Sequence, residues 1–421
     1  MKVRIHHLFI FTTSIAMLMY FGLSRTAMPW WFSSMHCIIW IAIGLMMLHR
    51  KGRKRLLNPP EKSILFLFGL PYLFYWLFSV FAWIHNGYIE PDTISRSISG
   101  TIQYMLIVTY VVVLSNLFKD NFVKYTFQAA ILNNIIVILF AILRWGIKDF
   151  IIVGLVPFSE FASSWTLDNL NVSAYLEVHD ITFAFGFFLI YYFLFYENKN
   201  RVKNIIICSI FIYLGLKRIQ LAALFLTIGL SIFIKGRSKK GIKFWIIVLT
   251  ASTLTVLMAF IWLIDTNIIS QLATAYNINF MGRLRVYFNL GKYFSFGPDY
   301  LGRGMQYGRI IATRLMEQRI LNYTGHSDVL LNYIDYGFYE FILWIVFLCY
   351  ICPRHIFKKY GLKSARIWIL FCIYAFITYL TDNTMTYFCF QSVYMIIMYH
   401  MMQTSNVLNQ ISTSNVLKVK L

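Results

Sequence analysis

Long apolar runs are the feature of this 421-residue sequence that most restricts how it folds. A helix needs about 20 mostly apolar residues to cross a bilayer, and the chain offers about twelve runs near that length. Charged residues make up only 13% of the chain, against about 25% in soluble domains. The sequence therefore predicts an all-α polytopic membrane protein, with transmembrane helices near 8–24, 31–48, 64–84, 101–118, 125–143, 181–196, 203–216, 219–234, 244–264, 333–352, 366–381 and 384–402.

Lysine and arginine gather in four connections between these runs, at 49–62, 197–203, 235–243 and 354–366. Cytoplasmic loops of membrane proteins are rich in both residues, so this pattern predicts that both termini lie in the cytoplasm. The net charge of +21 then comes mostly from topology. That origin argues against a nucleic-acid partner.

The largest connection, about residues 265–335, lies on the non-cytoplasmic side in this topology. It divides the predicted organisation into an N-terminal bundle of about nine spans at 1–264, a loop with short helices at 265–332, C-terminal spans at 333–402 and a cytoplasmic tail at 403–421. Long loops cross the membrane largely regardless of their charge. The basic residues of this loop therefore need an explanation other than topology.

Six of the seven basic residues in this loop are arginine: Arg283, Arg285, Lys292, Arg303, Arg309, Arg314 and Arg319. The planar guanidinium binds phosphate through two parallel hydrogen bonds, which lysine does not provide. We therefore expect an anionic partner, such as a phospholipid or a polyprenyl pyrophosphate headgroup. The alternative is a surface helix that contacts solvent or membrane lipid.

Helical spacing separates these arginines. If 305–321 is helical, Arg309, Arg314 and Arg319 fan around its axis at 3.6 residues per turn, and we do not expect them to serve one ligand together. Arg283 and Arg285 point to different sides of a helix, so we expect one of them to face a site. Gly302 and Gly304 flank Arg303, where glycine permits a tight turn and a close backbone approach.

His326 stands just before the helix that follows the loop. Gly325 or Ser327 is a candidate cap for that helix, and its dipole favours a neutral His326 that can act as a base. The alternative is a hydrogen-bonded polar residue with no chemical role.

Ionisable residues within or near spans are functional candidates. They include Glu340, which we expect to pair inside the bundle; the others are Lys217, Arg218, Asp335 and Asp382.

The connection at 144–180 mixes carboxylates such as Glu160 with aromatic residues. That mixture suits sugar binding, and it equally suits an aromatic belt at the membrane surface.

Cys349 and Cys352 form an isolated CxxC within apolar sequence, which favours small buried residues over a metal or redox site. The sequence thus predicts no metal site and no cofactor.

The segment from His326 to Gly337 resembles the signature of the O-antigen ligase/polymerase superfamily. That signature has a His, an acidic residue nine positions later, here Asp335, and a Gly eleven positions later. Upstream, Gly282-Arg283 resembles the arginine that opens the family's large periplasmic loop, and Gly302-Arg303-Gly304 resembles its GxG. Arg218 resembles an arginine that the family carries after a short outward turn. Ser327 departs from the usual Asn, which tilts the resemblance toward a polymerase.

The resemblance implies an inner-membrane enzyme that transfers glycans at the periplasmic face from an undecaprenyl-pyrophosphate-linked oligosaccharide. In a polymerase the acceptor is an incoming lipid-linked repeat unit, and in a ligase it is lipid A core. The implied reaction needs no metal, and the implied pathway partners are a flippase and a chain-length regulator. The predicted roles are His326 and Arg283 in catalysis, Arg218, Arg283, Arg303 and Arg285 at the pyrophosphate, and Glu160 and Asp335 at the sugar.

A flippase or transporter of about twelve helices is an alternative from another class. Such proteins show internal repeats and interrupted helices near the middle of the membrane. We find no internal repeat, and the long loop lies off-centre in the sequence. The sequence therefore favours glycosyl transfer.

Overall fold

The computed structural model describes residues 4–419, except 19, 22–25, 28–30, 53–56, 152–180, 198, 216, 235–238, 277–282 and 322–326. Across these residues the chain consists of helices joined by turns and loops, with one antiparallel pair of two-residue strands, β1 (Tyr20–Phe21) and β2 (Thr26–Ala27). The predicted all-α class is confirmed. The chain forms two compact units that interleave along the sequence: unit 1 at 1–61, 109–228 and 386–404, and unit 2 at 62–108, 229–385 and 405–421.

Helices of unit 1 include the pair α1 and α6, which pack against each other, and α9, which packs on α10. The interior of this unit is aromatic, since Phe183, Phe185, Phe187 and Phe188 of α9 are all fully buried. The helices mainly in unit 1 are α1 (Ile5–Ala16), α2 (Trp31–Arg50), α6 (Phe122–Trp145), α9 (Ile181–Leu194), α10 (Arg201–Leu214), α11 (Arg218–Phe233) and α18 (Phe388–Val419).

Unit 2 contains several long helices and the basic segment between two of them. Its helices are α4 (Leu70–Asn86), α12 (Lys239–Asp265), α13 (Ile268–Ala275), α14 (Arg283–Leu290), α15 (Tyr307–Glu317), α16 (Asp328–Val346) and α17 (Cys352–Thr381). α5 (Thr93–Phe118) begins in unit 2 and ends in unit 1. The short helical segments of the two units together are α3 (Pro59–Ile64), η2 (Leu65–Gly69), η3 (Lys119–Asn121), η5 (Gly291–Tyr293), η6 (Phe347–Ile351) and η7 (Thr384–Thr386).

Within the described residues, five helical stretches are long and apolar enough to cross a membrane: Trp31–Arg50, Pro59–Asn86, Thr93–Trp145, Lys240–Asp265 and Asp328–Thr381. The third and fifth have 53 and 54 residues, more than twice what one crossing needs. Each is interrupted: Lys119 has φ 49° where α5 meets α6, and Gly361 has φ 81° within α17. Their length and composition are those of a membrane protein.

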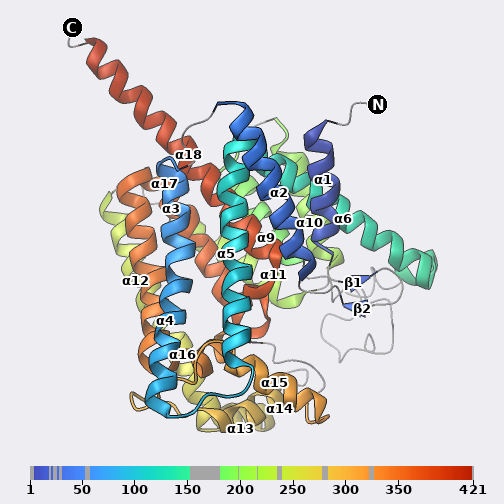
Figure 1. Ribbon diagram of the computed structural model, residues 1–421, viewed down its shortest axis with the longest axis vertical. Coiled ribbons are helices and arrows are strands. Elements are labelled where there is room, and N and C mark those ends of the chain that lie inside the picture. The colour runs from blue at the N-terminus through green and yellow to red at the C-terminus, as the bar shows by residue number, and fades with distance from the viewer. Residues whose placement is uncertain are drawn as a thin grey trace. The chain divides into compact units, whose positions relative to one another are not determined.

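The segment between α12 and α16 carries the short helices α13, α14 and α15. Figure 1 shows them gathered at one end of the long helices of unit 2. Each buries one face, for example Val286, Tyr287 and Leu290 of α14, and Tyr287 meets Phe260 of α12 edge to face. The arginines of the sequence analysis therefore stand on an ordered layer of short helices.

Candidate functional site

A break in α16 organises this end of unit 2. Gly337 has φ 71° and ψ −173°, which interrupts the helix. It lies against Gly302, whose φ is 85°. A Cβ added to Gly302 would lie 2.5 Å from the carbonyl oxygen of Asp335, and one added to Gly337 would lie 2.3 Å from the backbone nitrogen of Gly302. Only glycine allows this contact between the two backbones.

The loop from Tyr300 to Gly304 supplies the hydrogen bonds that the break removes. The backbone N–H groups of Arg303 and Gly304 donate to the carbonyls of Ile334 (3.1 Å) and Asp335 (2.8 Å). The Tyr300 hydroxyl also donates to the Ile334 carbonyl at 2.7 Å. Buried backbone polar groups need hydrogen-bond partners, and this loop supplies them to the carbonyls at the break.

Side chains of α4 and α5 hold the same loop from its other side. Trp83 Nε1 donates to the carbonyl of Arg303 at 3.0 Å, and Asn86 Nδ2 donates to that of Gly302 at 2.9 Å. Next along the loop, the backbone of Met305 accepts from the hydroxyl of Ser97 and donates to that of Ser79; the two hydroxyls come from α5 and α4. The backbone around Arg303 is thus bonded on both sides.

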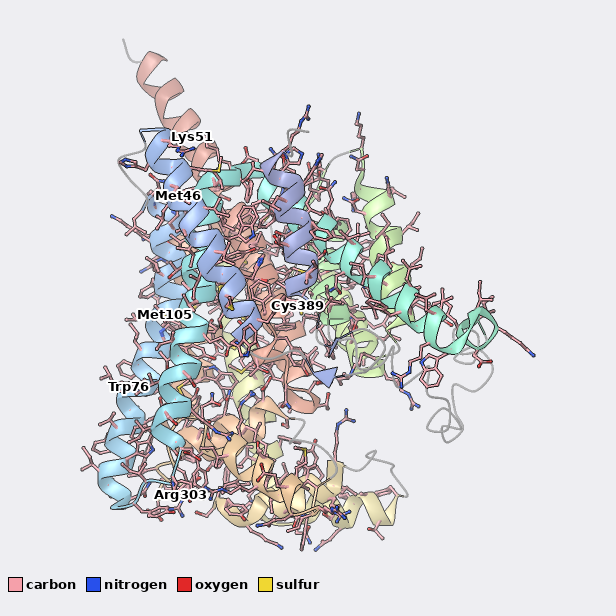
Figure 2. The ribbon with its side chains drawn as sticks, turned by 45° about the vertical axis from the view of Figure 1, so that its right-hand side comes forward. Met46, Lys51, Trp76, Met105, Arg303 and Cys389 are labelled. Carbon is pink, nitrogen blue, oxygen red and sulfur yellow. The ribbon has the colours of Figure 1, made fainter. Side chains whose placement is uncertain are left out.

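The side chain of Arg303 is exposed, in contrast to its backbone. Figure 2 shows Arg303 at the end of unit 2 where the short helices lie, whereas Trp76 lies further along α4. Burial raises the pKa of the Tyr300 and Tyr307 hydroxyls, and the positive charge of Arg303 acts in the opposite direction on both. The guanidinium therefore lies near these two tyrosines, and it has no ion pair within the part of the chain that the structure describes.

The Asp335 side chain is hydrogen-bonded to the start of α15. Its carboxylate accepts from the backbone N–H groups of Gln306 and Gly308, each at 2.7 Å. These groups begin α15, where helical N–H groups lack partners within the helix. The predicted sugar-binding role of Asp335 stays a prediction, and the observed bonds make it a residue that positions α15.

Arg309 and Arg314 of α15 have different partners, as their helical spacing predicts, whereas Arg319 lies beyond the end of α15 at Glu317 and has φ 58°. Arg309 Nη2 donates to Asp328 Oδ1 at 3.2 Å, and Arg314 forms an ion pair with Glu90 of the α4–α5 connection. Arg319 is exposed. Burial tends to raise the pKa of Glu90, but hydrogen bonds from Tyr88 and Arg314 outweigh it and leave that pKa below its ordinary value.

Ser327 caps the start of α16, as predicted by one of the two alternatives from the sequence. Ser327 Oγ accepts from the backbone N–H of Leu330 at 3.2 Å. Asp328 is only 1% exposed, and its second oxygen accepts from the backbone N–H of Met385 at 2.7 Å. The N-terminus of α16 is therefore tied to α15 and to the segment after α17.

Arg283 and Arg285 differ in their environments, as expected for neighbours on opposite sides of a helix. Arg283 is half-buried, and its Nε atom is buried and has no hydrogen-bond partner within the described part of the chain. Arg285 is exposed. A buried guanidinium donor without a partner is costly, so Arg283 is the better candidate to hold a ligand.

Several predicted site residues are not placed beside this cluster. His326, Glu160 and Gly282 lie outside the described residues. Arg218 begins α11 in unit 1, whereas the groups above all belong to unit 2. Their predicted roles stay predictions.

Glu340 corrects one expectation from the sequence. We expected this residue to pair inside the bundle, yet neither of its carboxylate oxygens has a hydrogen-bond partner within the described chain, and it is 1% exposed. It lies three residues after the break at Gly337, where the second part of α16 begins.

Sequence reasoning missed the groups that hold the loop, above all Trp83, Asn86 and Tyr300. The only sequence signal was the pair of glycines around Arg303, because residue patterns do not show which distant helix supplies a donor. No group of three or more His, Cys, Asp or Glu residues that could hold a metal occurs in the described chain. No protein-family model matches the chain, and no curated protein matches it significantly.

Proposed function

We propose that this chain is a membrane glycosyltransferase that polymerises oligosaccharide repeat units carried on undecaprenyl pyrophosphate. In this proposal it crosses the inner membrane about twelve times, with both termini in the cytoplasm and the arginine-rich loop in the periplasm. The topology rests on the basic connections of the sequence. The reaction rests on the resemblance and on the chemistry of the loop.

The observation that carries the proposal is that two arginines of the loop have guanidinium groups available to a ligand. Within the described chain, the buried Nε donor of Arg283 has no hydrogen-bond partner. The guanidinium of Arg303 has no ion pair there, whereas the backbone around Arg303 is hydrogen-bonded on both sides. Donors held in place before a reaction stabilise developing charge without reorganising. A pyrophosphate leaving group develops such charge, and guanidinium groups match its geometry.

The proposed step transfers the growing glycan. A hydroxyl oxygen of the incoming repeat unit attacks the anomeric carbon of the glycan, and the bond from that carbon to the pyrophosphate oxygen breaks. The electron pair leaves on undecaprenyl pyrophosphate, where Arg283 and Arg303 balance the charge, with Arg285 as a further predicted ligand. His326 takes the proton of the attacking hydroxyl.

Variants in a strain that lacks the chromosomal copy test this assignment. Arg283→Ala and His326→Ala are expected to insert normally, by immunoblot of membranes, and to abolish long glycan chains on a gel. Arg319→Gln is the matched control, because Arg319 is an exposed arginine of the same loop, and it should keep the normal ladder. A normal ladder from both site variants would refute the assignment. Unattached long polymer in the deletion strain would indicate a ligase instead.

One observation favours the transporter alternative. α16 is interrupted at Gly337, and interrupted helices bind ions and substrates in many transporters. Here, however, the carbonyls of Ile334 and Asp335 are occupied by the chain's own loop, so they are not available to an ion. Repeat units accumulating on the cytoplasmic side of a deletion strain would support a flippase over a polymerase.

A further inference from the structure

We propose that the exposed surface of α13 and α14 binds the anionic phospholipid headgroups of the adjoining leaflet. This surface consists of Leu272 and Tyr276 at α13 and of Arg285, Phe288 and Lys292 at α14 and η5. It shares Arg285 with the predicted pyrophosphate ligands, but its other residues take no part in the glycosyl-transfer proposal and its test does not depend on enzymatic activity.

Apolar side chains without cover are the first observation. Leu272 is 41% exposed, Tyr276 is 73% exposed and Phe288 is 54% exposed. The opposite faces of both helices are buried, through Ile269 and Ala273 on α13 and through Val286, Tyr287 and Leu290 on α14. Short helices that bury one face and expose large apolar groups on the other are typical of a membrane interface.

The charge of this segment is the second observation. Between Asp265 and Asp299 the sequence has no acidic residue, but it has Arg283, Arg285 and Lys292. Arg285 and Lys292 are exposed, and the Lys292 ammonium lies 4.7 Å from the centre of the Phe288 ring. Residues 285, 288 and 292 share one helical side, so the bases surround an apolar side chain. A solvated surface helix would be expected to carry both signs of charge, whereas an anionic headgroup layer attracts bases alone.

The position of the segment is the third observation. α12 has 27 residues, which at 1.5 Å per residue is about 40 Å, longer than the roughly 30 Å hydrocarbon core. α13 begins three residues after α12 ends, and α13 contacts both α12 and α14. Figure 1 shows α13 and α14 beside the end of the long helices of unit 2. This continuity places the surface at headgroup level.

Lipid-carried quenchers test the proposal on the full-length protein in nanodiscs. The six native cysteines are buried, so an environment-sensitive fluorophore can be attached at Phe288→Cys, with Glu317→Cys on α15 as the control site. Spin-labelled phosphatidylglycerol is compared with spin-labelled phosphatidylcholine at equal content. We expect stronger quenching at 288 by the anionic lipid and little quenching at 317 by either.

Charge variants then identify the cause of the preference. The double variant Arg285→Gln/Lys292→Gln should lower the preference for the anionic lipid by about five-fold for each base removed. Arg319→Gln, an exposed arginine outside the surface, should leave it unchanged. Equal quenching by both lipids, or no quenching at 288, would overturn the proposal. A signal at 288 that requires two copies per nanodisc would also overturn it and assign the surface to a second copy of the chain.

Discussion

Arg303 combines a fixed backbone with a free side chain, and this combination is the clearest functional feature at the scale of single residues. Its carbonyl accepts from Trp83 and its N–H donates to Ile334, so the chain does not need to move to present the guanidinium. Arg309 and Arg314 are instead engaged by carboxylates. The loop therefore separates arginines that build structure from arginines that are available to a ligand.

The contact between Gly302 and Gly337 gives a sharp residue-scale prediction. Gly302→Ala or Gly337→Ala places a Cβ within 2.6 Å of backbone atoms at a positive φ, which we expect to cost about 3 kcal/mol or more. The measurement is the thermal unfolding midpoint in detergent. Gly87→Ala is the control, because Gly87 also has a left-handed φ but nothing lies within 4 Å of its added Cβ. A glycine variant at 302 or 337 as stable as the control would contradict this account.

The Glu90–Arg314 ion pair gives a pH dependence. The pKa of Glu90 lies below its ordinary value of 4.5 in the folded state, so its contribution is present above that pH and is lost as the pH falls through the folded pKa. Arg314 is 40% exposed, which limits the effect to about 1 kcal/mol or less. Unfolding midpoints of the parent and Glu90→Gln should differ above about pH 5 and converge as the pH falls through the lowered pKa of Glu90. A constant difference across this range would disprove the assignment.

At the scale of elements, the break in α16 and the loop that fills it act together. Asp335 holds the start of α15 through two backbone hydrogen bonds, and Asp328 holds α15 through Arg309. α16 therefore fixes α15 from two points about two turns apart. α16 thus positions the loop and α15 in addition to being part of a helical stretch long and apolar enough to cross a membrane.

Removing the Asp335 carboxylate should release α15 while leaving the long helices intact. Asp335→Ala is expected to cost about 2–4 kcal/mol, since two buried N–H groups lose a charged acceptor, and Asp335→Asn should cost less because it keeps one acceptor oxygen. Limited proteolysis measures the effect, with faster cleavage expected between residues 305 and 320. Equal protection of Asp335→Ala and the parent protein would show that other contacts hold α15.

The sequence predicted the positions of the helices well, because apolar runs and their flanking bases depend on local composition. A helix occurs at each predicted run, although α1 ends at Ala16 and not near residue 24. The break at Gly337 was not predicted, since a single glycine in an apolar helix is unremarkable until its contact with Gly302 is known. Within the candidate site, the division between Arg283 and Arg285 was predictable from helical geometry, whereas the partners of Arg309 and Arg314 required the fold.

At the scale of the whole molecule, the two compact units interleave, and no residue pattern indicates that arrangement because it depends on long-range packing. Unit 2 takes α4, α12, α16 and α17 from distant parts of the chain. The arginine-rich segment belongs entirely to this unit, which links the position of the loop to the orientation of those helices.

Cysteine labelling tests the proposed orientation. Because the native cysteines are buried, single cysteines at Arg319 and Lys51, both exposed positions, can be labelled selectively. The proposed topology puts these two positions on opposite sides of the membrane. A membrane-impermeant maleimide added to intact spheroplasts should label Arg319→Cys and leave Lys51→Cys unlabelled until the cells are lysed. The reverse pattern would invert the topology.

The most direct measurement of the central claim uses the purified protein and one lipid-linked repeat unit. Mass spectrometry of the products should show undecaprenyl pyrophosphate released in step with a lipid-linked dimer and longer chains. The double variant Arg283→Ala/Arg303→Ala should form none, and Arg319→Gln should form the full series. Chains formed at the parent rate by the double variant, or an intact substrate with the parent protein, would contradict the account.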